Sequence, residues 1–201
     1  SSGALFDLDK LDNISKNYIS KMKAVDLYQE YLVWAKKYDE AVASLLVNHK
    51  EDTIAFLNIE RECKKPRKDY ENYSSIFAKI WYLYDEEWNK DLTYDFGLIQ
   101  DKEEILNIMN QYLDAYYDSN DTQDVWFQKI KELCEQLGYA SDMKAYKENK
   151  EAYKGSIADF TCAMRVVLTT SSVTPNLYDI MQILGKERML KRVEIFKNKN
   201  L

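Results

Sequence analysis

Apolar residues recur at helical spacing along most of the chain, and the clearest case lies in its last quarter. At about 100° per residue, one narrow stripe there contains Ile157, Phe160, Thr161, Met164 and Leu168. Ser156 followed by Asp159 fits a capping pattern at the start of this stretch, and Gly155 breaks whatever precedes it. The pattern therefore predicts a mostly buried helix that begins next to Ser156.

Arg165 is the only charged residue between Phe160 and Tyr178. It lies on the shoulder of the apolar stripe, where a permanent cation needs an acceptor, and the neighbouring residues supply none. Arg165 is therefore a candidate ligand-binding residue. The alternative is an ion pair with an acid from elsewhere in the fold.

A short helix is predicted over 175–184, after the apolar one. Thr174 followed by Pro175 is typical of an N-cap and a first helical position, and Gly185 is a natural stop. A final helix from Lys186 carries six basic and two acidic residues up to Lys199. A lone arginine, a helix N-terminus and a basic helix together suit an anionic, hydrogen-bonding ligand.

The remaining pattern also favours helices. We expect them over 24–38, 39–47, 51–65, 101–117 and 123–137, with a polar helical connection over 140–154. Pro66 ends the third of these, and Thr122 caps the last. Five glycines and two prolines in 201 residues leave few breaks, and no convincing strand pattern occurs. The sequence therefore predicts an all-α fold, divided near Gly97 into 1–97 and 98–201.

Charge is unevenly distributed over the chain. The net charge is −6 with a pI near 5.0, which argues against a nonspecific nucleic-acid binder. Twelve acidic residues and two lysines lie between Asp85 and Asp124, whereas Arg61–Tyr70 contains five basic and two acidic residues. Such a protein can bind RNA locally and repel it elsewhere, although most of these charges fit solvated helix faces.

An aromatic stretch follows the basic segment. Tyr70, Tyr73, Trp81 and Trp88 lie within it. These side chains either stack unpaired bases or, as we favour for Trp81 and Trp88, fill the space between helices.

No constellation for catalysis or metal binding is present in the sequence. Cys63, Cys134 and Cys162 are far apart and odd in number, and His49 has no acid or cysteine constellation around it. No nucleophile–base pair, phosphate-binding loop or metal-ligand spacing occurs, and no apolar run spans a bilayer. We therefore expect no catalytic residue, no metal, no cofactor, no membrane contact and a cytoplasmic location.

Two stretches resemble bacterial glutamyl-tRNA synthetases. The run MRVVLTTSSVTPNLYDIMQILGKERMLKR, from Met164 to Arg192, is similar to their C-terminal signature without a gap. The opening GALFDLDKL resembles their linker helix, with matches at Gly3, Ala4, Phe6, Asp7, Lys10, Leu11, Tyr18 and Ile19. Thr170 and Ala163 stand where the signature has glycine and proline.

The resemblance implies two consecutive helical bundles that read a tRNA anticodon. Residues 1–97 would form the linker helix and a first, stem-contacting and anticodon-binding subdomain, and 98–201 a second anticodon-binding subdomain. It assigns Arg165 to the central anticodon bases, and Thr174, Pro175 and Leu177 to the third. The segment Lys64–Asp69 resembles a basic KPRKD element, which makes Arg67 and Lys68 both candidates for the first base.

It also implies a parent enzyme that attaches glutamate to tRNA(Glu) with ATP and Mg²⁺, while this chain lacks the catalytic motifs. The implied partner is tRNA(Glu), with tRNA(Gln) left open, bound by a monomer that binds no DNA. The alternative is a helical protein-interaction scaffold that never binds RNA.

Overall fold

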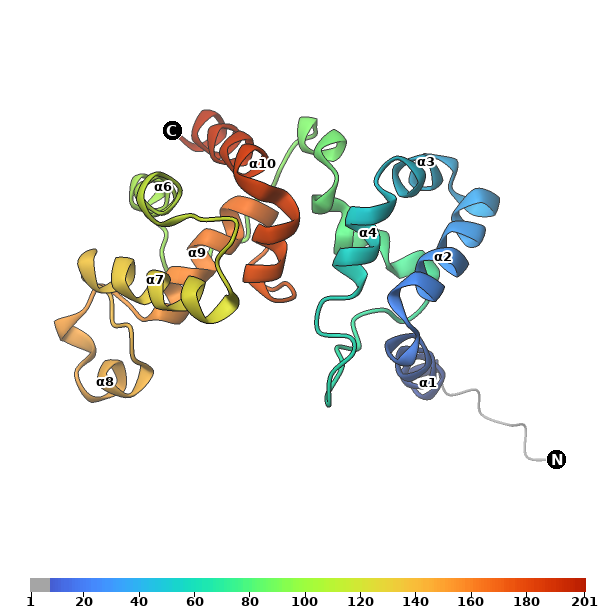
Figure 1. Cartoon of the computed structure of the whole chain (residues 1–201), viewed down its shortest axis with the longest axis horizontal. Helices are drawn as coiled ribbons and strands as arrows, with labels where there is room; N and C mark the ends of the chain where they lie inside the picture. The colour runs from blue at the N-terminus through green and yellow to red at the C-terminus, as the bar shows by residue number, and fades with distance from the viewer. Residues whose placement is uncertain (1–7) are drawn as a thin grey trace. The chain divides into compact units, whose positions relative to one another are not determined.

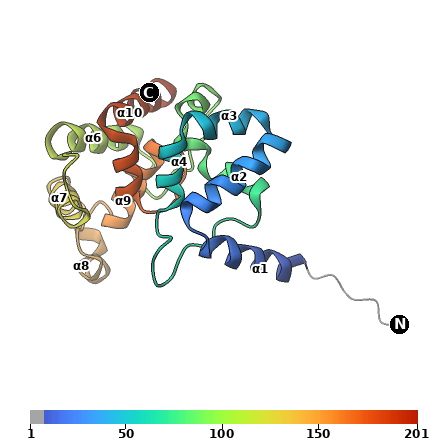
Figure 2. The same ribbon diagram turned by 45° about the vertical axis from the view of Figure 1, so that its right-hand side comes forward.

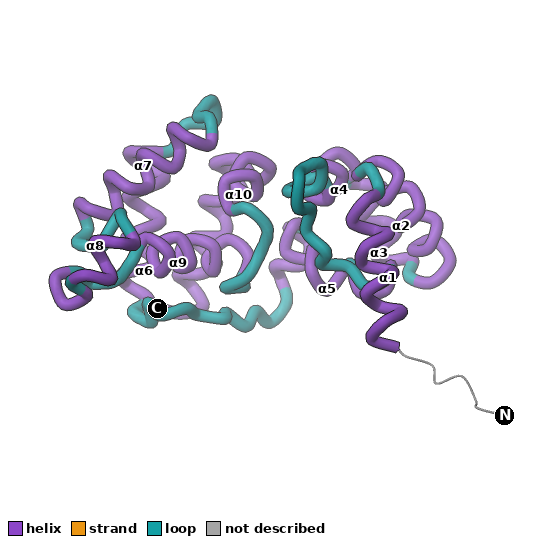
Figure 3. The backbone as a smooth tube through the Cα atoms, turned by 90° about the horizontal axis from the view of Figure 1, so that it is seen from below, coloured by secondary structure: helices purple, strands orange, loops and turns teal. Residues whose placement is uncertain are grey.

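Helices and loops form the whole of the computed structural model over the part it describes, residues 8–201 (Figure 1). No strand occurs within this range, where a single isolated bridge joins Ala140 to Ser156. Figure 3 shows the same backbone as helical and loop segments alone. The predicted all-α class is confirmed.

The described helices fall into two compact units, one ending at Glu87 and the other spanning Trp88–Leu201. The α-helices are α1 (Leu8–Lys21), α2 (Ala24–Tyr38), α3 (Glu40–Asn48), α4 (Lys50–Leu57), α5 (Phe77–Ile80), α6 (Lys102–Gln111), α7 (Gln123–Gln136), α8 (Met143–Glu148), α9 (Ile157–Thr169) and α10 (Leu177–Asn200). Short 3₁₀ segments are η1 (Tyr73–Ser75), η2 (Trp81–Leu83), η3 (Asp85–Asn89) and η5 (Lys150–Ala152), and η4 (Tyr112–Tyr116) is a π-helical turn.

The first unit is built around α2, which packs against α3 and α4. Leu27 and Tyr31 of α2 are fully buried there. The Tyr28 hydroxyl donates to the carbonyl oxygen of Leu46 at 2.7 Å, which ties α2 to α3. A buried hydroxyl with a partner avoids the cost of an unsatisfied polar group.

Only part of the predicted linker helix falls within the described residues. Gly3, Ala4, Phe6 and Asp7 lie outside them. On α1, Ile19 is buried whereas Leu11 and Tyr18 are exposed.

The helix after α3 ends earlier than predicted. It stops at Leu57 rather than at Lys65, and Glu60 adopts a left-handed backbone with φ 52°. The buried Arg61 then donates from Nε to the Leu57 carbonyl at 2.7 Å. Residues 58–72 continue as an irregular loop that leaves the end of α4 (Figure 2), so Pro66 lies in a loop and does not end a helix.

The second unit is organised around α9, which packs against α6, α7 and α10 (Figure 1). Val166, Val167 and Leu168 of α9 are completely buried. From α6 and α7, Ile108 and Ile130 are also fully buried. The prediction of a mostly buried helix here is correct.

Two segments of this unit differ from the sequence prediction. The expected helix over 101–117 becomes α6 followed by the π-helical turn η4. The expected helical connection over 140–154 contains only the short α8 and η5. The two ends of this connection are hydrogen-bonded to each other rather than within a helix. Ala140 N–H donates to Gly155 O and Lys154 N–H donates to Gly138 O, each at 2.9 Å.

The final helix also differs from the expected basic surface at one position. Arg192 is buried, with Nη1 donating to the Leu168 carbonyl at 2.7 Å. Its guanidinium carbon lies 4.3 Å from the centre of the Trp88 ring, a cation–π arrangement. Arg192 therefore joins α10 to the end of α9. The exposed basic residues of this helix are Lys186, Lys191, Lys197 and Lys199.

The described residues hold the cysteines as free thiols, with Cys63 exposed, Cys134 buried and Cys162 half-buried. Burial raises the pKa of the Cys134 thiol to about 12, which leaves it unreactive. Within 8–201, no helix has the length and apolarity to cross a membrane. Over the same range, no group of three or more His, Cys, Asp or Glu residues could hold a metal ion.

Candidate functional site

Arg165 is positioned by α9, whose start is a capping box. The Ser156 N–H donates to Asp159 Oδ2 at 2.8 Å, and the Asp159 N–H donates to Ser156 Oγ at 3.3 Å, as the sequence predicted. The residues after Arg165 are fully buried, whereas Arg165 itself is half-buried. Its side chain therefore lies on the one face of α9 that reaches the surface of this unit.

The turn after α9 is held by side chains and by a second segment. Thr170 ends the helix with a left-handed backbone, φ 65°. The Asp95 N–H donates to the Thr170 carbonyl at 2.8 Å, and Asp95 Oδ2 accepts from the Ser172 N–H at 3.3 Å. The Thr169 hydroxyl donates to the Arg165 carbonyl at 2.8 Å. The start of the loop between α9 and α10 is therefore held in place by Asp95 and Thr169.

α10 begins two residues later than predicted. Asn176, not Thr174, is the N-cap, and its side-chain oxygen accepts from the Tyr178 N–H at 2.9 Å. The Thr174 hydroxyl instead donates to the carbonyl of Pro175 at 2.8 Å, and Pro175 is buried before the helix starts. The predicted break at Gly185 is correct, since its φ of 69° and ψ of 169° interrupt the helix.

Two of the residues proposed from the sequence line one pocket. Arg165 from α9 and Leu177 from α10 face a cavity of about 330 Å³. Thr161 and Asn176 complete this side of it. Thr174 and Pro175 do not line the cavity.

The other lining residues come from the first turns of α7, which the sequence analysis did not connect with the site. Its lining residues are Gln123, Asp124, Trp126 and Phe127. Thr122 starts this helix by accepting from the Val125 N–H at 3.4 Å, as predicted. Phe127 is 40% exposed. The sequence signal for this wall was the pair of aromatic residues, Trp126 and Phe127, about one turn after the predicted N-cap Thr122.

Contacts of Trp126 and Tyr178 fix the start of α7 relative to the start of α10. The Trp126 and Tyr178 ring centres are 5.7 Å apart, and the Tyr178 hydroxyl donates to the Asp121 carbonyl at 2.7 Å. These contacts join the start of α7 to the start of α10.

The pocket combines hydrogen-bonding groups with an aromatic side. Arg165 supplies donors, Asp124 supplies acceptors, and the amides of Gln123 and Asn176 supply both. Its volume lies at the lower end of the range for small-molecule sites. A planar heterocycle with donors and acceptors on its edge suits these groups.

The basic segment in the first unit separates into buried and exposed residues. Arg61 is buried and bonded to backbone carbonyls, so it is not part of a ligand surface. Arg67 makes two hydrogen bonds to Asp69, from Nε at 2.7 Å and from Nη2 at 3.1 Å. Lys64 and Lys68 are exposed.

Two of the four aromatic residues named after this segment belong to the core, and the core role that we favoured is confirmed for Trp88. Tyr70 and Trp88 are buried, whereas Trp81 is half-buried. Tyr73 is also half-buried, and its hydroxyl donates to Glu30.

His49 has a partner that the sequence did not predict. It lies between α3 and α4 with Nε2 at 2.6 Å from Glu86 Oε1. That hydrogen bond lowers the pKa of Glu86.

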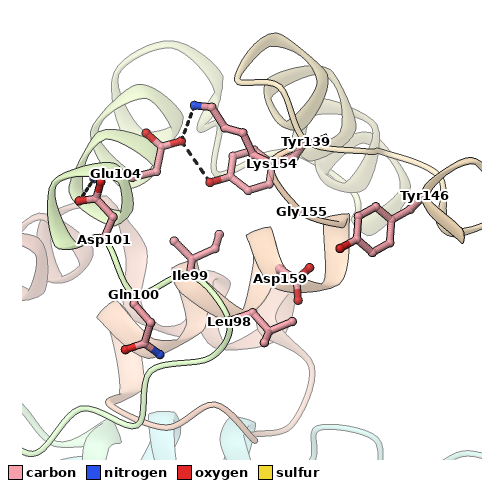
Figure 4. Close-up of a pocket in the computed structure, with 10 residues that line it drawn as sticks. All are labelled: Leu98, Ile99, Gln100, Asp101, Glu104, Tyr139, Tyr146, Lys154, Gly155 and Asp159. Carbon is pink, nitrogen blue, oxygen red and sulfur yellow. Dashed lines mark hydrogen bonds and ion pairs between the residues drawn. The ribbon is translucent and has the colours of Figure 1, made fainter. Parts of the chain in front are cut away.

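A second cavity, of about 360 Å³, also lies in the second unit, and most of its charged side chains are engaged within the protein (Figure 4). Glu104 accepts from Lys154 Nζ at 2.9 Å and from the Tyr139 hydroxyl at 3.1 Å. Asp101 caps α6, and Asp159 belongs to the capping box of α9. These side chains stabilise the fold at this cavity. Fewer of their hydrogen-bonding groups are therefore available to a ligand.

Comparison with known proteins relates the chain to one family of ligases. Residues 140–197 match a family described as "Anticodon binding domain". The chain is 40% identical over 194 residues to a glutamate–tRNA ligase of Acetivibrio thermocellus, which covers 96% of this chain and 35% of that protein. It is 41% identical over 194 residues to the glutamate–tRNA ligase of Clostridium perfringens strain 13, with the same coverage.

A more distant relative, the glutamate–tRNA ligase of Sorangium cellulosum, is 31% identical over 194 residues and matches 96% of this chain and 34% of its own length. The chain thus spans about a third of the length of the curated relatives that it matches. These matches confirm the resemblance predicted from the two sequence stretches.

Proposed function

We propose that this chain is the anticodon-recognising part of a glutamate–tRNA ligase and that its pocket binds anticodon bases of a tRNA. The observation that carries the proposal is the single cavity shared by Arg165 and Leu177, two residues assigned to anticodon reading from the sequence alone. Proteins read RNA sequence best on unpaired bases, which they stack on aromatic side chains and bind by their edges. The pocket has both kinds of group.

Within this function, Arg165 donates to the edge of a central anticodon base. Leu177 contacts the third base directly. Thr174 and Pro175 contribute through the turn that sets the start of α10, because the Thr174 hydroxyl bonds to the Pro175 carbonyl at 2.8 Å.

For the first base we propose Lys68 rather than Arg67. Arg67 is engaged in two hydrogen bonds with Asp69, whereas Lys68 is exposed. A lysine acts as a point charge, so Lys68 contacts the phosphate beside that base.

The rest of the proposal follows the family resemblance of the sequence and, for the tRNA partner, the names of the relatives. The partner is tRNA(Glu), with tRNA(Gln) as the second candidate, and the protein acts as a monomer in the cytoplasm. The first unit contacts the tRNA stem and the first anticodon base, and the second unit reads the other two. Attachment of glutamate with ATP and Mg²⁺ belongs to a catalytic part outside these 201 residues, so this chain by itself does not charge tRNA.

Two variants and a salt series test the proposal. The chain should bind tRNA(Glu) with an affinity that falls with salt at a log–log slope of about −0.7 per phosphate neutralised. Arg165→Ala should weaken binding by about 1–3 kcal/mol, relax the preference at one anticodon base and leave the salt slope unchanged. Lys68→Ala should weaken binding to every tRNA alike and reduce the slope by about one phosphate contact.

Filter binding with tRNA(Glu) and with tRNAs altered at single anticodon bases measures both quantities. Binding with no preference for any anticodon, or equal behaviour of the two variants, would contradict the proposal. No tRNA binding at all would favour the protein-scaffold alternative.

A further inference from the structure

Tyr178 joins the two helices α7 and α10 at the pocket through both its ring and its hydroxyl. It follows Leu177 in the first turn of α10, and its hydroxyl donates to the Asp121 carbonyl at 2.7 Å. Asp121 directly precedes Thr122, the N-cap of α7. The Tyr178 ring centre lies 5.7 Å from that of Trp126, which lines the pocket from α7. One half-buried side chain therefore connects the start of α7 with the residue next to Leu177.

The acceptor of this hydrogen bond is itself held against α7. Asp121 Oδ2 accepts from Lys129 Nζ at 2.7 Å, and the Asp121 side chain is only 10% exposed. Lys129 lies in the middle of α7, so a shift of Asp121 away from this helix would break the ion pair. The Tyr178 hydroxyl thus binds a carbonyl whose position is set by α7.

The part of α10 that lines the pocket is short and depends on such contacts. The backbone of Gly185 interrupts the helix, so the turns that carry Leu177 end at Leu184. A helix of this length is marginal in isolation and is stabilised mainly by its tertiary contacts. The apolar contacts of its buried residues have no preferred direction, whereas the hydrogen bond of Tyr178 fixes an orientation.

We propose that Tyr178 is a positioning residue for RNA binding, which holds Asn176 and Leu177 in place relative to the first turns of α7 before RNA arrives. The inference rests on the proposed function. Tyr178 acts through the two residues that precede it, and both of these line the pocket. A preformed pocket avoids the free-energy cost of ordering its lining residues when a base binds.

A purely structural role for Tyr178 predicts a different result. Loss of its hydrogen bond would then lower the stability of the second unit, and the folded protein would bind RNA as before. The positioning role instead predicts a loss of affinity that depends on the anticodon bases, because these are the groups that the pocket binds.

The test compares Tyr178→Phe with a matched control in the same unit. Tyr178→Phe removes the hydroxyl and keeps the ring beside Trp126. Tyr116→Phe also removes the hydroxyl of a half-buried tyrosine, which donates to Gln136 Oε1 at 2.8 Å at the other end of α7 and outside the pocket.

Each protein is titrated with two RNAs, the anticodon stem-loop of tRNA(Glu) and the same stem-loop with its three anticodon nucleotides made abasic. Circular dichroism gives the melting temperature of each protein, and the titrations are made at a temperature where all three are folded.

The wild-type chain should bind the intact loop at least about tenfold more tightly than the abasic loop, because the abasic loop cannot make base contacts. Tyr178→Phe should reduce this ratio by about fivefold, an effect of the size that one hydrogen bond provides, and should bind the abasic loop like the wild type. Tyr116→Phe should retain the ratio, even where its melting temperature falls as far as that of Tyr178→Phe.

A Tyr178→Phe variant that keeps the wild-type ratio, or an equal loss in Tyr116→Phe, would overturn the inference and leave the proposed function standing. Equal binding of the two loops by the wild-type chain, or no binding of either, would overturn the proposed function and the inference with it.

Discussion

Thr170 adopts a backbone conformation that β-branched residues rarely take. Its φ of 65° and ψ of −10° lie in the left-handed region at the end of α9. The Asp95 N–H holds its carbonyl at 2.8 Å, so the surrounding structure maintains the strained residue. Glycine adopts this conformation without a steric cost, which gives a physical reason for the glycine found here in the family signature.

Thr170→Gly should therefore raise the free energy of unfolding by about 1 kcal/mol, because it removes the left-handed strain. Urea denaturation followed by circular dichroism measures the change. Thr169→Gly is the matched control: Thr169 is helical, and its hydroxyl donates to the Arg165 carbonyl at 2.8 Å. That variant should lose about 1 kcal/mol. Equal losses in both variants would show that Thr170 is not strained.

At single residues, the sequence identified Arg165 because no other charge lies near it in the chain. It could not separate Arg67 from Lys68, since the pairing of Arg67 with Asp69 depends on how the loop folds. It also counted Arg61 and Arg192 as surface charges. Both are buried and donate to backbone carbonyls, which is a property of the packed fold and not of the local sequence.

At the scale of the elements, the loop after α4 is anchored by Arg61. Besides the Leu57 carbonyl, its guanidinium donates from Nη1 to the carbonyls of Ile19 at 2.6 Å and Met22 at 3.2 Å. The side chain thus binds carbonyls at and just after the ends of α1 and α4, where the last turn of a helix lacks intrahelical donors. Burial lowers the pKa of Arg61 from its ordinary value, and an arginine stays charged even so.

Arg61→Met keeps much of the apolar volume and removes these hydrogen bonds. We expect it to lower the free energy of unfolding by about 3 kcal/mol, since bonds to a charged donor contribute about 1.5–3 kcal/mol each. Lys64→Met, three residues along and exposed, should change stability by less than about 0.5 kcal/mol. Chemical denaturation of both variants is the measurement, and similar small effects would mean that Arg61 does not anchor the helix ends.

Helix ends were predicted well where the signal is local and poorly where it is tertiary. Ser156, Thr122 and Gly185 act as the sequence indicated, because caps and stops depend on nearby residues. α4 ends at Leu57 rather than before Pro66, because Glu60 has a left-handed backbone and the Arg61 side chain binds the Leu57 carbonyl. Asn176 caps α10 in place of Thr174. Both residue types are good N-caps, so the sequence alone could not decide between them.

At the scale of the whole molecule, the segment before α6 belongs to the core of the second unit. Trp88 stacks on Arg192, and the Tyr94 and Phe196 ring centres lie 5.2 Å apart. Burial raises the pKa of the Tyr94 hydroxyl to about 12, in keeping with this packing. The sequence placed the domain boundary after Gly97, whereas the compact units divide after Glu87.

Two fragments compare these boundaries. Residues 88–201 should unfold cooperatively, whereas 98–201 should be less stable by at least about 2 kcal/mol, because it lacks the desolvated cation–π contact of Trp88 with Arg192. Thermal denaturation of both fragments measures the difference. Equal melting temperatures would favour the boundary after Gly97.

The pocket could be predicted only in part. Arg165 and Leu177 are 12 positions apart and belong to one recognisable motif, so both could be assigned to the same site from the sequence. Asp124 and Phe127 come from a helix about 40 residues earlier, and only the packing of α7 on α9 makes them neighbours of Arg165. Long-range contacts of this kind have no local signature.

The break at Gly185 divides α10 into two halves with different roles. The turns before it hold Leu177 at the pocket, and the turns after it carry lysines into solvent. Under the proposed function, substitutions in the lysine-rich half would therefore alter how fast RNA is captured, because long-range attraction governs encounter rates. The contacts of Leu177 at the pocket would stay the same, so such substitutions would shift the salt dependence of binding and leave the preference for a base unchanged.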